Sequence, residues 1–170
     1  MKKAIFLDRD GIINIDHSYV YRQEDFEFCE GIFETLQHFL SLDYQLFIVT
    51  NQSGIGRGYY TKDDFEKLIS WMLSQFCSKN IKITKVYHCP HSPSEGCECR
   101  KPKTAMFKRA KKEFNIDMKN SWMIGDKPSD IQAGFNANIP NTIFVNSSTY
   151  NKEASYSVKS ILDTLDIIKE

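Results

Sequence analysis

Two aspartates one residue apart, Asp8 and Asp10, stand directly after a short apolar run at residues 4–7. The run has the composition of a buried strand in a parallel sheet, and Gly11 behind the pair lets the chain turn. Two neighbouring carboxylates repel each other and need a cation or a shared proton close by. Carboxylate oxygens are the ligands that a hard divalent cation prefers. The segment therefore suits a metal-assisted reaction, although a solvated turn beside a core strand would use the same residues.

Later apolar runs are also followed by polar or charged residues. Thr50 and Asp126 each close such a run, and Lys101 lies in the loop after another. The carboxyl ends of parallel strands meet at one edge of a sheet, where ligands bind. Carboxylates there can hold Mg²⁺, while a hydroxyl and an ammonium group donate to phosphoryl oxygens. Taken together, these strand ends predict a site for Mg²⁺ and a phosphate group.

A second group of residues has the composition of a zinc site. Three cysteines and one histidine lie within a stretch of eleven residues: Cys89, His91, Cys97 and Cys99. Three thiolates and one imidazole complete the tetrahedral shell of a structural Zn²⁺ ion. One residue separates Cys89 from His91 and Cys97 from Cys99, whereas zinc fingers usually have two residues within each pair. Free surface cysteines or a redox pair are therefore alternatives to a zinc site. Zinc in this proline-rich loop would fix the cations that follow, Arg100 and Lys101.

Strand-like and helix-like segments alternate along the chain. Apolar runs predict strands at residues 4–7, 45–50, 83–88, 122–124 and 142–145. Helical spacing predicts helices at residues 31–42, 62–79, 104–115, 128–138 and 158–168. The alternation predicts an α/β fold: a Rossmann-like, doubly wound parallel sheet with helices on both faces, no separate cap domain and a zinc-stabilised loop. We expect a single domain over residues 1–170.

The overall composition narrows the class of partner. Lys plus Arg and Asp plus Glu number 22 each, so no net charge attracts nucleic acid or an anionic membrane. Only four apolar residues separate Lys3 from Asp8, too few for a signal peptide, and five cysteines are an odd number for a disulfide framework. We therefore expect a cytoplasmic protein, and its balanced charge and small size favour a monomer.

The motifs resemble those of the haloacid dehalogenase-like phosphatases over roughly residues 3–146. They occur in the family order as Asp8-Arg9-Asp10-Gly11, Thr50-Asn51-Gln52, Lys101 and Gly125-Asp126-Lys127-Pro128-Ser129-Asp130. The resemblance implies that Asp8 is the nucleophile and Asp10 the general acid and base. It also implies that Asp8, the backbone carbonyl of Asp10 and Asp126 hold Mg²⁺, while Thr50 and Lys101 hold phosphoryl oxygens. Arg9 is left open between a structural ion pair and a substrate contact.

The Cys–His loop narrows the resemblance to family members that dephosphorylate a heptose 1,7-bisphosphate or histidinol phosphate. It implies substrate contacts from Asp16, His17, Ser18, Tyr19, Asn51, Gln52, Ser53, Arg100 and Lys127. Arg100 would suit the second phosphate of a bisphosphate. We expect removal of the 7-phosphate of the heptose bisphosphate through an aspartyl phosphate, in the synthesis of nucleotide-activated heptose. Histidinol phosphate as substrate, or phosphosugar binding without turnover, are the alternatives.

Overall fold

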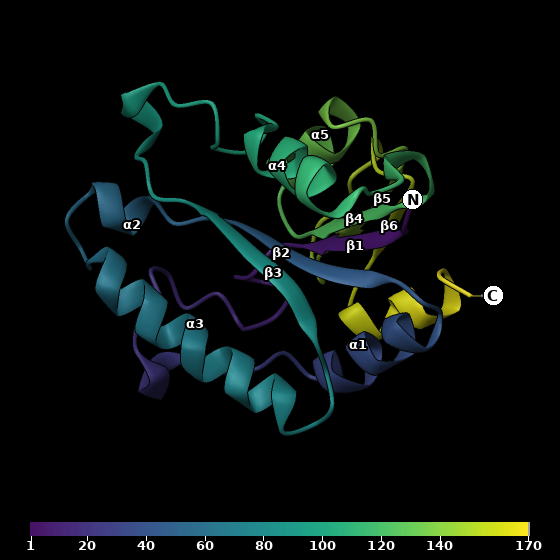
Figure 1. Ribbon diagram of the computed structural model, residues 1–170, viewed down its shortest axis with the longest axis horizontal. Coiled ribbons are helices and arrows are strands. Elements are labelled where there is room, and N and C mark those ends of the chain that lie inside the picture. The colour runs from purple at the N-terminus through teal and green to yellow at the C-terminus, as the bar shows by residue number, and fades with distance from the viewer. Residues whose placement is uncertain (170) are drawn as a thin grey trace.

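A six-stranded, wholly parallel sheet runs through the molecule in the order β3-β2-β1-β4-β5-β6 (Figure 1). The computed structural model describes residues 1–169, so residue 170 of the predicted domain lies outside the described residues. The strands are β1 (Ala4–Leu7), β2 (Gln45–Asn51), β3 (Ile83–Cys89), β4 (Trp122–Gly125), β5 (Asn141–Val145) and β6 (Tyr156–Val158). The predicted parallel sheet is confirmed.

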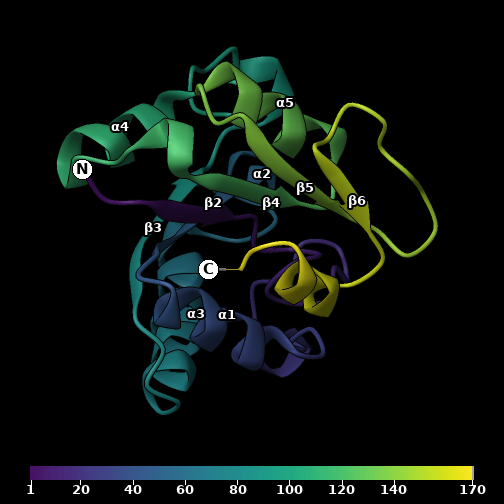
Figure 2. The ribbon, with the colours of Figure 1, turned by 90° about the vertical axis from the view of Figure 1, so that its right-hand side faces the viewer.

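Helices cover both faces of this sheet, as predicted (Figures 1 and 2). One face carries α1 (Ile32–Ser41), α3 (Lys62–Cys77) and the 3₁₀ helix η4 (Ile161–Asp166). The other face carries α4 (Ala105–Phe114) and α5 (Pro128–Asn136). Short elements in the connections are α2 (Ser53–Gly56), η1 (Gln23–Asp25), η2 (Pro93–Glu95) and η3 (Met118–Asn120). Within the described residues, no helix combines the length and the apolar character that crossing a bilayer requires.

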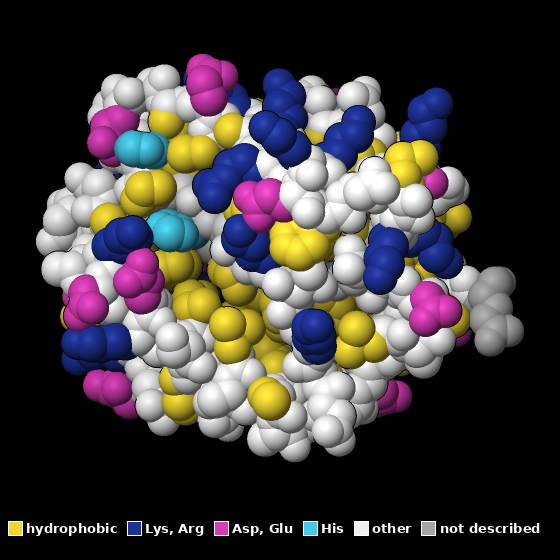
Figure 3. All heavy atoms as spheres, in the orientation of Figure 1, with side chains coloured by type: hydrophobic (Ala, Val, Ile, Leu, Met, Phe, Trp, Pro, Cys, Tyr) yellow, Lys and Arg dark blue, Asp and Glu magenta, His cyan; other side chains and the backbone are white. Residues whose placement is uncertain are grey.

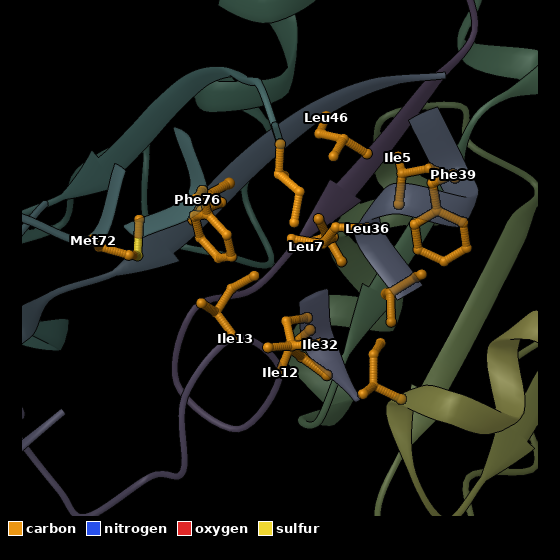
Figure 4. Close-up of a cluster of buried hydrophobic side chains, with 14 of the residues drawn as sticks. Ile5, Leu7, Ile12, Ile13, Ile32, Leu36, Phe39, Leu46, Met72 and Phe76 are labelled. Carbon is orange, nitrogen blue, oxygen red and sulfur yellow. The ribbon is translucent and has the colours of Figure 1, made fainter. Parts of the chain in front are cut away.

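Strand β1 is buried on both faces, which explains its uninterrupted apolar sequence. Ile5 and Leu7 belong to the cluster that α1 and α3 cover, and Phe6 belongs to the cluster under α4. Figure 4 shows Ile5 and Leu7 facing side chains of α1, including Phe39. Each such side chain stabilises the fold by about 1.5–3 kcal/mol when fully buried. The strand that presents Asp8 is therefore anchored from both sides.

Helix α3 begins with a reciprocal cap that its sequence predicts. The hydroxyl of Thr61 accepts a hydrogen bond from the backbone N–H of Asp64 at 3.0 Å. The carboxylate of Asp64 accepts one from the backbone N–H of Thr61 at 2.8 Å. Two otherwise unpaired N–H groups are thereby satisfied, so the start of the helix is fixed relative to the loop that follows β2.

The predicted helix at residues 158–168 is wrong. Residues 156–158 form β6, which pairs with β5, and the chain continues as the 3₁₀ helix η4. The apolar spacing arises because Ile161 and Ile168 pack against the α1 side of the core rather than because the segment is one α-helix. Strand β5 offers unpaired backbone groups at its edge, and β6 satisfies them.

Charged side chains of both signs are scattered over the face shown in Figure 3. That distribution agrees with the equal numbers of basic and acidic residues in the sequence. The concentrated charges of the molecule lie instead at the carboxyl edge of the sheet.

Candidate active site

The carboxyl ends of β1, β2 and β4 bring the predicted motifs together. β1 lies between β2 and β4 in the sheet, so Asp8, Thr50 and Asp126 leave neighbouring strands at the same edge. Carboxylate oxygens of Asp8, Asp126 and Asp130 all lie within 4.8 Å of one another. The Nζ atom of Lys101 lies 2.9 Å from Asp8 Oδ1, although Lys101 is remote in sequence. The predicted convergence of strand ends is therefore present in the fold.

Asp130 is a site residue to which the sequence reasoning gave no role. It lies in the first turn of α5, is almost wholly buried, and its Oδ1 atom is 2.6 Å from Lys101 Nζ. A Cβ atom at Gly125 would come within 2.2 Å of the Asp130 Cβ, so only glycine allows this approach. Its position two residues after Pro128, where an acidic residue caps a helix, was the available signal. Asp130 gives Lys101 a second carboxylate partner.

The carboxylates at this edge fit a divalent cation. Burial raises the pKa of Asp8 to about 6, and the neighbouring charge of Asp130 adds to the increase. Burial, followed by the charge of Asp8, raises the pKa of Asp126 to about 8. Asp126 Oδ1 is buried and has no hydrogen-bond partner among residues 1–169. A Cβ atom at Gly11 would come within 2.1 Å of Asp126 Oδ2, so the turn after Asp10 needs glycine. Oxygen ligands held together against their repulsion are the donors that Mg²⁺ requires.

Lys101 is a buried cation held from several sides. Burial alone would lower the pKa of its amine, but the charges of Asp130 and Asp8 raise it, so the group stays protonated. Its Nζ atom also donates to the backbone carbonyl of Val49 at 2.7 Å. Asn51, predicted as a substrate contact, accepts from the Lys101 backbone N–H at 3.0 Å and donates to its carbonyl at 3.3 Å. The ammonium group is thus fixed beside Asp8.

Asp10 is held by three donors. Its Oδ1 atom accepts from Arg9 Nη2 at 2.8 Å and from Asn14 Nδ2 at 3.0 Å, and its Oδ2 atom accepts from Gln52 Nε2 at 3.1 Å. Burial alone would raise the pKa of Asp10, but the charge of Arg9 and these hydrogen bonds lower it. The sequence reasoning left Arg9 open and gave Asn14 no role. The structure places Arg9 in a buried ion pair with Asp10.

Gln52 also connects Asp10 to Thr50. The same Nε2 group that donates to Asp10 donates to the Thr50 hydroxyl at 2.9 Å. Tyr60 donates its hydroxyl to Gln52 Oε1 at 2.5 Å, which fixes the direction of the amide. Thr50 receives this hydrogen bond, so its own proton is free to point toward a phosphoryl oxygen.

A cleft of about 280 Å³ opens beside Asp10. All the predicted substrate contacts except one line it: Asp16, Ser18, Tyr19, Asn51, Gln52, Ser53, Arg100 and Lys127. His17 is the exception, since its Nε2 atom lies 3.1 Å from Glu27 Oε2 and its ring lines a different hollow. Tyr60 and Ser129 also line the cleft, and the sequence reasoning assigned neither to the site.

The cleft carries two basic groups, Arg100 and Lys127. The Nη1 atom of Arg100 is buried and has no hydrogen-bond partner among the described residues. Lys127 Nζ lies 3.4 Å from Asp16 Oδ2 and 3.8 Å from Asp126 Oδ1. Burial alone would lower the pKa of Lys127, but Asp8 and the other nearby carboxylates raise it. Lys127 also lines the small hollow that contains Asp8 and Lys101, so the two cations suit anionic groups both at the reacting position and beside it.

The cysteines of the predicted zinc site converge, whereas the ring of His91 does not. Cys89 Sγ lies 2.7 Å from Cys99 Sγ and 3.5 Å from Cys97 Sγ. His91 Nδ1 lies 3.4 Å from Glu95 Oε1 and is outside the three-cysteine group. Burial alone would raise the pKa of Cys97, but hydrogen bonds, first from the Arg100 backbone, lower it to about 7. Three thiols this close suit a thiophilic cation such as Zn²⁺.

Comparison with known proteins supports this description of the fold. Residues 98–166 match the HAD-hydrolase-like family model. The chain is 56% identical to the D-glycero-alpha-D-manno-heptose-1,7-bisphosphate 7-phosphatase of Campylobacter jejuni, over 99% of this chain and 96% of the relative. It is 47% identical to the D-glycero-beta-D-manno-heptose-1,7-bisphosphate 7-phosphatase of Helicobacter pylori 26695, over 98% of each protein.

A solved structure has the same fold. The D,D-heptose 1,7-bisphosphate phosphatase of B. bronchiseptica, complexed with magnesium and phosphate, superposes with a TM-score of 0.88 at 23% identity, covering 97% of each chain. The fold, the motif residues and the identity to full-length relatives agree: the chain belongs to the haloacid dehalogenase-like hydrolases. Within that family it is similar over nearly its whole length to the heptose-1,7-bisphosphate 7-phosphatases.

Proposed function

We propose that this protein hydrolyses the 7-phosphate of D-glycero-D-manno-heptose 1,7-bisphosphate. The observation that carries the proposal is the pair of cations, Arg100 and Lys127, in a cleft that begins at Asp10. One phosphate would react beside Asp8 and Lys101, while the second would bind the guanidinium of Arg100, whose Nη1 atom has no hydrogen-bond partner among the described residues. The names of the relatives from Campylobacter jejuni and Helicobacter pylori support the same substrate.

The side chains at the sheet edge account for a two-step hydrolysis. A carboxylate oxygen of Asp8 forms a bond to phosphorus as the bond from phosphorus to the sugar oxygen breaks, and Asp10 gives that oxygen its proton. Water then attacks the aspartyl phosphate and passes a proton to Asp10. This step releases inorganic phosphate and restores the free carboxylate of Asp8. Lys101 and Thr50 stabilise the negative phosphoryl oxygens in both steps.

The negative charge of the bound substrate explains why Asp10 carries a proton at the start of the reaction. In the free protein Arg9 keeps the pKa of Asp10 low. A phosphate dianion beside this buried carboxylate favours its protonated form, because like charges disfavour ionisation. Asp10 can therefore act as an acid toward the leaving oxygen and as a base toward water.

Two metals belong to the proposal. Asp8, Asp126 and the backbone carbonyl of Asp10 would hold Mg²⁺, which when bound neutralises charge around the transferring phosphoryl group. Cys89, Cys97 and Cys99 would hold a structural Zn²⁺, with His91 as the fourth ligand expected from the sequence.

Phosphate release tests the substrate and the metal together. We expect turnover of the heptose 1,7-bisphosphate, faster with the α than with the β anomer, because the relative at 56% identity is named for the α form. Turnover should stop on chelation of Mg²⁺ and return when the metal is restored. Faster hydrolysis of histidinol phosphate would contradict the proposal while leaving the site chemistry intact. Binding of the bisphosphate without release would point to a non-catalytic protein.

We further propose that the protein works as a monomer in the cytoplasm. Five cysteines without a disulfide among the described residues suit a reducing compartment. Light scattering on the purified protein would test the monomer, and cell fractionation would test the compartment.

A further inference from the structure

Arg9 is a buried cation that the reaction steps above do not use. It is fully buried, and it is the largest of the fully buried side chains among residues 1–169. Its guanidinium lies 6.0 Å from the centre of the Phe26 ring and 5.9 Å from that of Phe65. Aromatic rings stabilise a cation at such distances, so α3 and the loop after β1 together hold the group in place.

One nitrogen of this guanidinium makes two contacts that belong to different parts of the site. Nη2 donates to Asp10 Oδ1 at 2.8 Å and to the backbone carbonyl of Val20 at 2.7 Å. Val20 directly follows Tyr19 in the segment that lines the cleft. A single amino group therefore joins the proton donor to the substrate-binding segment.

That segment has a backbone conformation that needs external support. Ser18 has a φ of 62° and Tyr19 a φ of 52°, so two adjacent residues other than glycine lie in the left-handed region. Such conformations persist only where the surrounding structure holds them. The centres of the Tyr19 and Tyr59 rings lie 4.8 Å apart in an edge-on contact. The hydrogen bond from Arg9 to the Val20 carbonyl fixes the chain immediately after Tyr19.

We propose that Arg9 is a positioning residue: it fixes Asp10 and the segment carrying Asp16, Ser18 and Tyr19 relative to each other. The proton donor then lies where the sugar oxygen arrives. This proposal rests on the proposed function, because it assigns Arg9 a part in the same reaction. Lysine cannot replace the guanidinium fully, since a compact ammonium group lacks the planar surface that lies beside the Phe26 and Phe65 rings.

The nature of the leaving oxygen provides a test. The sugar would leave as a strongly basic alkoxide and therefore depends on the proton from Asp10, whereas p-nitrophenolate is the weak conjugate base of an acidic phenol and leaves without that proton. For Arg9→Lys we expect the rate of leaving-group release in a single turnover at saturating substrate to fall at least ~10-fold with the heptose bisphosphate, a part of the usual effect of a general acid, and less than ~3-fold with p-nitrophenyl phosphate. Single-turnover release precedes the hydrolysis of the aspartyl phosphate, in which Asp10 acts with both substrates. KM for the bisphosphate should rise as the segment loses its anchor. Circular dichroism would show that the variant is folded.

A matched variant and a double-mutant comparison complete the test. Arg22 belongs to the same loop but is exposed and pairs with Asp25 at 2.9 Å, so Arg22→Lys should leave both activities unchanged. In an Asp10→Asn background, Arg9→Lys should add little further loss on the alkyl phosphate, because its effect passes through Asp10. If Arg9→Lys itself does not fold, Arg9→Met is compared in the same two backgrounds.

Two results would overturn the proposal: equal losses on both substrates, or the same loss with and without Asp10. If the wild-type protein does not hydrolyse the heptose bisphosphate, the proposed function fails separately. The Arg9 comparison is then made with whichever alkyl phosphate the wild-type protein hydrolyses, and its outcome is read in the same way.

Discussion

Individual residues in this site act as a balanced set of buried charges. Lys101 lies between Asp8 and Asp130, and Asp10 pairs with Arg9, with every side chain in these pairs at most 16% exposed. A buried pair contributes little net stability when complete, but removing one partner leaves an uncompensated charge. Each member is therefore needed for the others to keep their place.

Asp130 provides the prediction at this scale. Asp130→Asn removes one of the two carboxylates that hold Lys101, so we expect a loss of about 1–3 kcal/mol in the free energy of unfolding, since the hydrogen bond to a charged group weakens. Activity should fall as well, because the ammonium loses its fixed position. Chemical denaturation and phosphate release would measure both effects.

The matched control is Asp163→Asn. Asp163 caps η4 in the way that Asp130 caps α5, but it lies away from Lys101. This variant should lose stability without losing turnover per folded molecule. Equal effects of the two variants on turnover would show that Asp130 acts only as a helix cap.

The loop between β3 and α4 contributes only Cys97 and Cys99 to the hydrophobic clusters of the described residues. It leaves β3 at Cys89 and carries η2, a capped single turn, before it delivers Arg100 and Lys101 to the site. Cys89 is buried, whereas residues 93–96 are exposed. The three cysteines therefore connect an exposed segment to the core. A metal bound by them would fix the loop that carries Lys101, the cation beside Asp8.

The cysteine group predicts a dependence on zinc. Cys97→Ser removes one of the three thiols, so we expect loss of one bound Zn²⁺ per chain and a fall in Tm of at least about 5 °C, because 1 kcal/mol corresponds to about 2–4 °C in a chain of this size. Elemental analysis and thermal denaturation would measure both. The exposed Cys77 is the matched position, and Cys77→Ser should leave zinc content and Tm unchanged. A zinc-free wild-type protein with the same Tm would contradict a structural metal.

The molecule as a whole gathers its repelling carboxylates at one edge of a rigid sheet. Asp8 and Asp126 come from neighbouring strands anchored by the core on both faces, so the chain cannot relax to separate them. Folding therefore buries both carboxylates and brings like charges beside them, which raises both pKa values. A cation that binds only the folded state relieves the repulsion and stabilises the fold.

This coupling predicts that Mg²⁺ raises Tm. At 100 times its dissociation constant, a ligand specific to the folded state adds about 2.7 kcal/mol of stability. We expect a corresponding increase in Tm for the wild-type protein, and little for Asp126→Asn, which lacks one ligand. Without Mg²⁺ this variant should melt no lower than the wild type, because it carries one repelling charge fewer. Equal shifts in both proteins would mean that Mg²⁺ binds elsewhere.

Much of the fold and site could be predicted from local signals. The apolar runs indicate five of the strands, and the Thr61–Asp64 pattern correctly predicts the start of α3. Strand β6 could not be found in this way, because residues 156–158 are a strand only through pairing with β5. The position of Asp130 beside Lys101 likewise depends on how α5 packs against β4.

The sequence by itself determined which carboxylates, hydroxyl and ammonium groups follow the strands of a parallel sheet, and these are the residues that we propose attack phosphorus, donate a proton and bind Mg²⁺. It could do so because residue type and spacing suffice to place a carboxylate at a strand end. Only the tertiary structure decided the partners, since Arg9 with Val20, Lys101 with Asp130 and Gln52 with Asp10 meet across the fold. Contacts between segments distant in sequence depend on packing of the whole chain, which no local pattern encodes.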